Sequence, residues 1–159
     1  MTDSTINQQD LGILARTIID SNMYMVLGTA DESGQPWVSP VYYASAGYKE
    51  FYWVSSPEVR HSRNIEIHSH ISIVIFNSQA PIGTGQGVYM SAIAEELTGA
   101  DLDLGIEIFS RSSLAHGGRE WKPEDVGVPT LYRLYRATAS EHWVRDPLGR
   151  PDHRTPVMM

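Results

Sequence analysis

Apolar residues along the chain fall in short runs, and most of these runs fit β-strands better than helices. Residues 51–54 read Phe-Tyr-Trp-Val, and aromatic and β-branched side chains of this kind favour strands. Further strands are predicted at residues 23–30, 36–44, 71–76, 88–97 and 131–144. Pro40 cannot donate a hydrogen bond to a neighbouring strand, so it predicts an edge or a bulge in the second of these strands.

Three segments have the periodicity or the start signals of helices, at residues 11–22, 57–68 and 101–113. These helices do not alternate regularly with the strands. The spacing therefore favours a mainly β fold, a six-stranded antiparallel barrel with inserted helices, over a parallel α/β sheet. We expect a loose tail at residues 1–9, one domain at residues 10–146 and a C-terminal tail at residues 147–159, with a long surface loop at residues 114–130.

The stretch after the most aromatic strand has the composition of an anion site. Ser56 and Pro57 resemble the start of a helix, with Ser56 as N-cap and Pro57 in the first helical position. Arg60, His61 and Arg63 follow within about one turn. Free N–H groups and the dipole at a helix N-terminus favour a bound anion, so these residues predict a phosphate site. The alternative is an ordinary helix start with solvated arginines.

Composition narrows the class of protein. The 159 residues fit one domain, and the charged fraction of 19% is low enough to suggest that some surface is hidden in an oligomer. The net charge of -7 argues against general binding of nucleic acid. There are no cysteines, the N-terminus is polar and no apolar run is long enough to span a membrane. We therefore expect a soluble cytoplasmic protein that binds neither nucleic acid nor membranes.

Two other kinds of site receive little support. The six histidines raise a metal hypothesis, with His68, His70 and His61 as the candidates. No nearby carboxylate is arranged to complete the usual three or four ligands, so no metal site is predicted. A hydrolase is not supported either, because the chain has no Gly-x-Ser-x-Gly nucleophile elbow.

The order of the segments resembles the pyridoxamine-phosphate-oxidase-like flavoproteins, the FMN-binding split-barrel family. An opening helix is followed by Val-Leu-Gly-Thr-Ala with an acidic-Gly turn, by Gln-Pro-Trp-Val-Ser-Pro-Val-Tyr, and by Phe-Tyr-Trp-Val-Ser-Ser with an Arg-bearing helix. The similarity covers roughly residues 10–145. It implies a homodimer, with FMN in two equivalent clefts between the subunits, and two-electron oxidoreduction of a small-molecule substrate.

The resemblance also implies roles for individual residues. Those expected to contact FMN are Ser39, Pro40, Val41, Val54, Ser55, Arg60, His61, Gln86, Gly87 and Trp143. Within this set Ser55, Arg60 and His61 would hold the phosphate, and Trp143 would come from the partner subunit. The positions that match the family's substrate helix are Ser110 and Arg111. The catalytic residues stay unassigned.

The chain departs from the family pattern at four positions. His61 stands where the family has a lysine, so its charge depends on pH, and a phosphate beside it is expected to raise its pKa. FMN affinity is then expected to weaken as pH rises through that pKa. Val38, Tyr43 and Glu107 replace side chains that hold a vitamin phosphate in the oxidases. A true pyridoxamine-phosphate oxidase is therefore not expected.

Two alternatives stay open beside an FMN-dependent oxidoreductase. A deazaflavin-dependent reductase shares the barrel and the phosphate position, so the same residues would serve another cofactor. A non-catalytic protein that binds or stores flavin or haem would use the same cleft without a reaction. Hydride chemistry belongs to the flavin itself, so few protein groups distinguish these functions.

Overall fold

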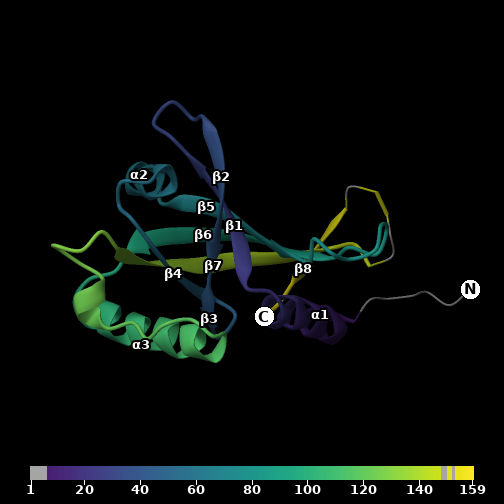
Figure 1. The fold of residues 1–159 in the computed structure, drawn as a ribbon. Helices are drawn as coiled ribbons and strands as arrows, with labels where there is room; N and C mark the ends of the chain where they lie inside the picture. The colour runs from purple at the N-terminus through teal and green to yellow at the C-terminus, as the bar shows by residue number, and fades with distance from the viewer. Residues whose placement is uncertain (1–6, 148–149, 152) are drawn as a thin grey trace, which may run out of the picture.

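One curled antiparallel sheet forms the centre of the protein in the computed structural model, which describes residues 7–147, 150–151 and 153–159 (Figure 1). Its strands are β1 (Tyr24–Ala30), β2 (Pro36–Tyr42), β3 (Ala44–Ala46), β4 (Glu50–Ser55), β5 (His70–Phe76), β6 (Gly87–Glu96), β7 (Arg133–Arg145) and β8 (Arg154–Val157). They are ordered β2-β1-β5-β6-β7-β4-β3, and β8 pairs with β7. The sheet curls far enough that β2 contacts β4, although four strands (β1, β5, β6 and β7) lie between them in this order.

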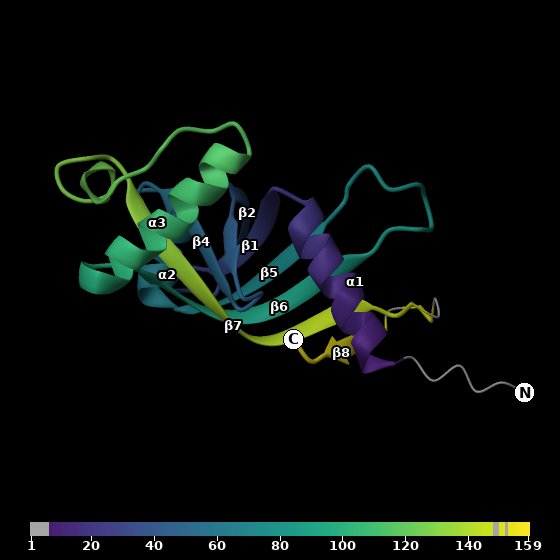
Figure 2. The same cartoon turned by 90° about the horizontal axis from the view of Figure 1, so that it is seen from below.

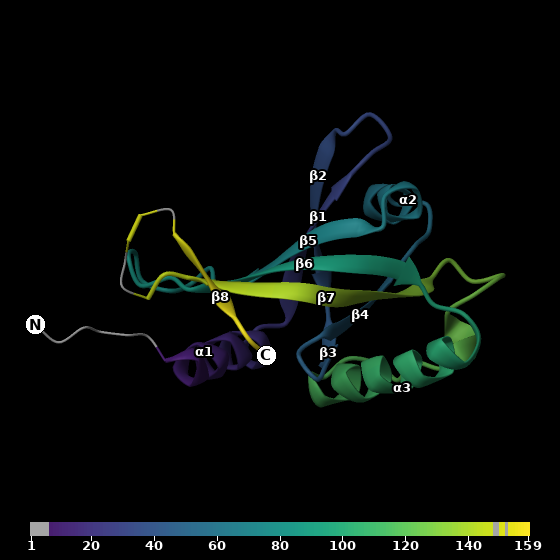
Figure 3. The ribbon, with the colours of Figure 1, turned by 180° about the vertical axis from the view of Figure 1, so that it is seen from behind.

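Three α-helices and one short 3-10 helix accompany the sheet. They are α1 (Gln8–Ser21), α2 (Arg60–Ile67), α3 (Gly99–Ala115) and η1 (Pro123–Asp125). Figure 2 shows α1 and α3 on the same side of the sheet, whereas α2 lies at its end in contact with β1, β2 and β6. Seen from behind, β5, β6 and β7 present a face that none of the described helices covers (Figure 3).

Two hydrophobic clusters share the strand β4. Phe51 and Trp53 are fully buried in the larger cluster inside the curled sheet, while Tyr52, 1% exposed, belongs to a smaller cluster beneath α3. Alternate residues of a strand point to opposite faces, so β4 is covered on both sides. This double burial explains why its sequence is apolar at every position from Phe51 to Val54.

The described residues form eight strands, so the expected count of six is wrong. The strand predicted at residues 36–44 is interrupted at Tyr43, whose N–H donates to Met23 O at 3.2 Å and whose hydroxyl donates to the Asn22 carbonyl at 2.9 Å. Beyond this break β3 pairs with β4 rather than with β1. The second additional strand, β8, falls within the residues expected to form the C-terminal tail.

The helix boundaries also differ from the prediction. α2 begins at Arg60, three positions later than predicted, because Ser56 forms a local turn: its Oγ accepts from Glu58 N at 3.1 Å, and its carbonyl accepts from Val59 N at 3.4 Å. α3 extends two residues beyond its predicted range at each end. Most of the tail predicted at residues 1–9 lies outside the described residues. None of the described helices has the length and apolarity needed to cross a membrane.

Candidate functional site

The imidazole of His61 joins two strands from the two ends of the curled sheet. Its Nδ1 lies 3.1 Å from Ser39 Oγ on β2, and its Nε2 lies 2.9 Å from Ser55 Oγ at the end of β4. The His61 side chain is buried, with 7% of the residue exposed. Because β2 is one edge of the sheet and β4 lies next to the other edge, these two contacts bridge the gap between its ends.

Burial lowers the pKa of His61 below its ordinary value of 6.5, so the imidazole is neutral at pH 7. A neutral imidazole donates from one nitrogen and accepts at the other, which suits two hydroxyl groups that can each do either. The direction is opposite to the raised pKa expected from the sequence for a histidine beside phosphate. The protein environment itself thus opposes the charged form.

Arg60 precedes His61 on α2 and lies exposed over Trp37, with its Cζ 4.5 Å from the centroid of the indole ring. Such a stack holds the planar guanidinium in one orientation. Arg60 makes no ion pair with any described residue, whereas Arg63 pairs with Glu58 at 2.5 Å. Arg60 is therefore the cation of this helix that is available to an anion.

Backbone N–H groups are available beside Arg60. The N-cap Val59 has no side-chain cap, and the N–H groups of Arg60, His61 and Ser62 have no acceptor within the described part of the chain. N–H groups at such a helix end, together with the helix dipole, attract anions. We call Ser55, Arg60, His61 and these N–H groups the anion corner.

The remaining residues expected on β2 and β4 differ in exposure. Pro40 is exposed on β2, but Val41 is 8% exposed and belongs to the main core, so only its backbone is open to a ligand. Val54 precedes Ser55 on β4 and faces the opposite side, where it packs against the cluster beneath α3. Its side chain therefore points away from the anion corner.

Gln86, Gly87 and Trp143 lie in another part of the sheet. Gln86 and Gly87 line a cavity of about 440 Å³ at the start of β6, together with Arg145. The Oε1 atom of Gln86 is buried without a hydrogen-bond partner among the described residues. Trp143 is on β7, opposite Tyr89 of β6. These residues form a second group, which we call the β6–β7 group.

The strand registers place Pro40 and the β6–β7 group on different parts of the sheet. Pro40 pairs with Val26, Val26 with Val74, Val74 with Tyr89, and Tyr89 with Trp143. This row crosses four strand intervals, or roughly 19 Å along the sheet at the usual strand spacing. Ser55 of the anion corner pairs with Arg133, ten residues before Trp143 on β7, so a single chain does not bring Trp143 to the anion corner.

The two predicted substrate residues on α3 have partners of their own. Ser110 Oγ accepts from Trp121 N at 2.8 Å and so fixes the loop that follows α3. Arg111 is exposed and pairs with Glu107 at 2.9 Å, one helical turn earlier. Both residues line a cavity of about 370 Å³ between α3 and this loop. The structure does not place them near the anion corner or the β6–β7 group.

Two polar clusters in the structure were not predicted from the sequence. The Tyr42 hydroxyl lies 2.8 Å from Ser112 Oγ and 3.0 Å from His116 Nδ1, joining the end of β2 to the end of α3. Asn64 donates to Thr29 Oγ1 at 3.0 Å and anchors α2 to β1. The partners lie more than 30 positions apart in each cluster, so no local spacing reveals them.

Trp37 is also absent from the predicted site. Trp37 lies two positions before Ser39 and therefore on the same face of β2, which the alternation of a strand does indicate.

As for metals, the described residues contain no group of three or more His, Asp or Glu side chains that could hold an ion.

The family of the chain follows from a comparison with protein-family models. The model described as pyridoxamine 5'-phosphate oxidase matches residues 13–125. The chain belongs to this family. The matched residues include β1 to β6, α2 and α3, and hence the whole anion corner. A search of curated protein sequences found no match.

Solved structures show the same fold in proteins of the pyridoxamine-phosphate oxidase family and in others. A heme binding protein from Mycobacterium smegmatis is 19% identical, with a TM-score of 0.69 over 90% of this chain and 55% of that chain. A Clostridium acetobutylicum protein related to general stress protein 26 of B. subtilis is 16% identical, with a TM-score of 0.63 over 97% of each chain. An F420 reductase is 12% identical, with a TM-score of 0.60 over 80% of this chain and 94% of that chain.

The chain thus spans little more than half the length of the mycobacterial protein. At these identities the likeness establishes the fold alone. The ligand has to be inferred from the chemistry of the site.

Proposed function

We propose that this protein is an FMN-binding flavoprotein that works as a homodimer and carries out two-electron oxidoreduction of a small molecule. The observation that carries this proposal is the anion corner: an exposed Arg60 held over Trp37 without a carboxylate partner in the described residues, beside the free N–H groups of α2 and the Ser55 hydroxyl. In a chain of net charge -7, a local site of this kind favours a phosphate group.

The ring of FMN would lie along β2. This strand is an edge of the sheet, so one side of its backbone has no strand partner, and Pro40 in its middle has no N–H to pair. When bound, FMN supplies the hydride chemistry, and the protein has to hold the ring, hydrogen-bond its edge and leave one face open. The exposed stretch from Val38 to Pro40 is suited to that task.

A second subunit would complete the site. The β6–β7 group lies on the sheet some 19 Å from Pro40 at the usual strand spacing, and it offers the unpaired Oε1 of Gln86 as an acceptor for an N–H group of the ring. A twofold axis brings a patch on one subunit against a different patch on the other. Phe76 and Ile93, 47% and 49% exposed, add apolar surface to the intervening strands.

The residues around the site fit a substrate without a phosphate group. Tyr43 stands at the position expected to hold a vitamin phosphate, yet it is 4% exposed and its hydroxyl is used by the carbonyl of Asn22. Glu107 carries a carboxylate where the substrate tyrosine is expected, and it neutralises Arg111. We therefore propose an oxidoreductase other than pyridoxamine-phosphate oxidase.

The proposal is tested by absorbance and by titration with cofactors. The purified protein is titrated with FMN, FAD, riboflavin, a deazaflavin cofactor and haemin, and its mass in solution is measured with and without FMN. We expect tight binding of FMN, weak binding of riboflavin and a dimer. Preference for the deazaflavin would instead indicate the reductase class of the F420 reductase neighbour, and preference for haemin would indicate a haem-binding protein.

A matched pair of variants tests the anion corner itself. Arg60→Ala removes the free cation and is expected to weaken FMN binding by about tenfold or more, the usual effect of losing a charge-assisted contact. Arg63→Ala removes an equal charge one turn away, but that charge is already paired with Glu58, so a change of less than about threefold is expected. Equal losses would place the phosphate elsewhere.

A further inference from the structure

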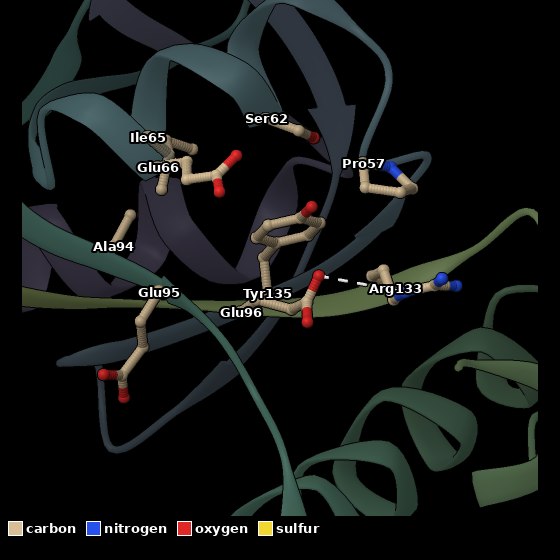
Figure 4. A pocket seen from close by; sticks show the side chains of 9 residues that line it. All are labelled: Pro57, Ser62, Ile65, Glu66, Ala94, Glu95, Glu96, Arg133 and Tyr135. Carbon is tan, nitrogen blue, oxygen red and sulfur yellow. Dashed lines mark ion pairs between the residues drawn. The ribbon is translucent and has the colours of Figure 1, made fainter. Parts of the chain in front are cut away.

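We propose that the cavity between α2 and the β6–β7 pair binds a small organic cation rich in hydrogen-bond donors, of the class of primary alkylamines. The cavity measures about 510 Å³, which is within the range of small-molecule sites (Figure 4). Its polar lining comes from Ser62 and Glu66 of α2, Glu96 at the end of β6, and Tyr135 of β7. This ligand is independent of FMN and of the anion corner.

The periodicity of α2 separates the two sites. Arg60 and Asn64 are one turn apart and contact Trp37 and Thr29 on the side of β1 and β2. Ser62 follows Arg60 by two residues, or about 200° around the helix axis. Ser62 and Glu66 therefore line the opposite flank of α2, and the cavity does not overlap the surface on which Arg60 lies.

The cavity has an excess of negative charge. Glu66 forms no ion pair with the described residues, and the Glu96 carboxylate lies 3.9 Å from Arg133 Nε. The Arg133 Nη1 already donates to the carbonyls of Thr130 and Tyr132 at 2.9 and 2.7 Å. In Figure 4 the guanidinium points away from Glu66, so it does not neutralise that carboxylate.

The Glu95 carboxylate does not contribute to the excess of negative charge in the cavity. Its carboxylate pairs with Arg136 at 2.6 Å, and Figure 4 shows it directed away from Tyr135. Two carboxylates, those of Glu66 and Glu96, are thus left to face the cavity with at most one weakly placed cation. The net charge of -7 adds to the attraction for a cationic ligand.

A buried hydroxyl points independently to a ligand. Ser62 is 3% exposed, and its Oγ interacts with the Tyr135 hydroxyl but makes no hydrogen bond of standard geometry with any described residue. In Figure 4 this hydroxyl and that of Tyr135 point toward each other across the upper part of the cavity. Burial raises the pKa of Tyr135, so its phenol is neutral at pH 7. Buried polar groups almost always have partners, so an unpaired one at a cavity wall marks a position for a donor or an acceptor.

The chemistry of the lining selects the class of ligand. Carboxylates only accept hydrogen bonds, and both hydroxyls can accept, so the matching ligand has to donate several. A primary ammonium has three donors and a positive charge. A metal ion is not supported, because the described residues contain no cluster of three or more metal-binding side chains. A primary amine with a short apolar stem, which can pack against Ile65 and Ala94 of the lining, satisfies all these requirements.

The test uses n-butylamine as the probe, followed by NMR of the amide resonances of the full chain. Two matched compounds serve as controls: n-butanol has the same stem without charge, and tetramethylammonium has the charge without donors. We expect n-butylamine to shift the resonances of residues 62–66, 94–96 and 133–135, and to bind about tenfold more tightly than either control. Equal binding of the three compounds, or shifts confined to other residues, would overturn the proposal.

Variants distinguish binding in the cavity from non-specific attraction of a cation to a negatively charged protein. Glu66→Gln and Glu96→Gln are each expected to weaken butylamine binding by about fivefold to tenfold. Glu32→Gln removes the same charge from an exposed residue before β2 and should leave the affinity unchanged. Ser62→Ala should weaken binding by a smaller factor. Affinities that respond equally to Glu32→Gln and Glu66→Gln would refute a defined site. The titration is repeated with FMN present, to show that the affinity for butylamine does not depend on the flavin.

Discussion

The two flanks of α2 differ in how their buried polar groups are satisfied. On the flank toward β1, β2 and the end of β4, His61 contacts two serine hydroxyls and Asn64 donates to Thr29. On the flank toward β6 and β7, Ser62 is equally buried, but its Oγ makes no hydrogen bond of standard geometry with the described residues. A helix of eight residues thus has one flank that fastens the sheet and another that borders a cavity. Burial of a polar side chain alone does not tell these roles apart.

The largest effect is expected for His61→Ala, which removes both contacts between β2 and β4. We expect the free energy of unfolding to fall by about 2–4 kcal/mol, because two hydrogen bonds are lost and two hydroxyls are left unpaired. Urea denaturation measures this change. His68→Ala, an exposed residue at the end of the same helix, should change the stability by less than about 0.5 kcal/mol. A similar loss in both variants would mean that His61 does not hold the strands together.

The pH dependence of stability also tests the role of His61, and its expected effect is smaller. The pKa of His61 is lowered by burial, so the unfolded chain takes up a proton at higher pH than the folded protein does. Stability is then constant above the unfolded value of 6.5 and is lost as pH falls from there toward the lower folded pKa. The pKa of His142 is lowered by burial as well and acts in the same direction.

Denaturation of the protein at several pH values between about 7 and 5, a window that begins above the histidine pKa, measures this loss. In His61→Gln the slope below the unfolded pKa should decrease and the contribution of His142 should remain. An unchanged slope would show that His61 is not the group that titrates.

The smallest effect on stability is expected for Ser62→Ala on the other flank. Its hydroxyl loses only the poorly aligned interaction with Tyr135, so the free energy of unfolding should change by less than about 0.5 kcal/mol, or rise slightly. The same urea measurement applies. A loss comparable to that of His61→Ala would indicate that the hydroxyl is hydrogen-bonded in solution.

The sequence predicted the strand interiors better than the connections between them. The apolar runs at Phe51 and Ile71 match β4, which is buried on both faces, and β5, in which alternate residues are buried. The start of α2 was misplaced because the hydrogen bond from Glu58 N to Ser56 Oγ stabilises a turn that competes with the helix. β8 was missed because it owes its place to pairing with β7, a long-range contact that its own composition does not encode.

The candidate site was predictable where its residues are close in the chain. Arg60 and His61 could be selected from the stretch around them, and the structure adds that Arg63 is paired with Glu58, whereas Arg60 forms no ion pair with the described residues. The cavity beside Glu66 could not be predicted, because it also needs Glu96 and Tyr135, which come from two distant strands. A cavity that depends on the mutual placement of three segments leaves no pattern in the sequence of any one segment.

The order of the strands has a consequence for how the chain is assembled during synthesis. The contacts of His61 with Ser39 and Ser55 span only 22 and 6 positions, so they can form once this part of the chain has emerged. β7 is made more than 70 residues later and fits between β6 and β4. A nascent chain that ends before Arg133 therefore displays two unpaired strand edges, which are templates for pairing with other chains. The late arrival of one strand makes the unfinished protein prone to aggregation.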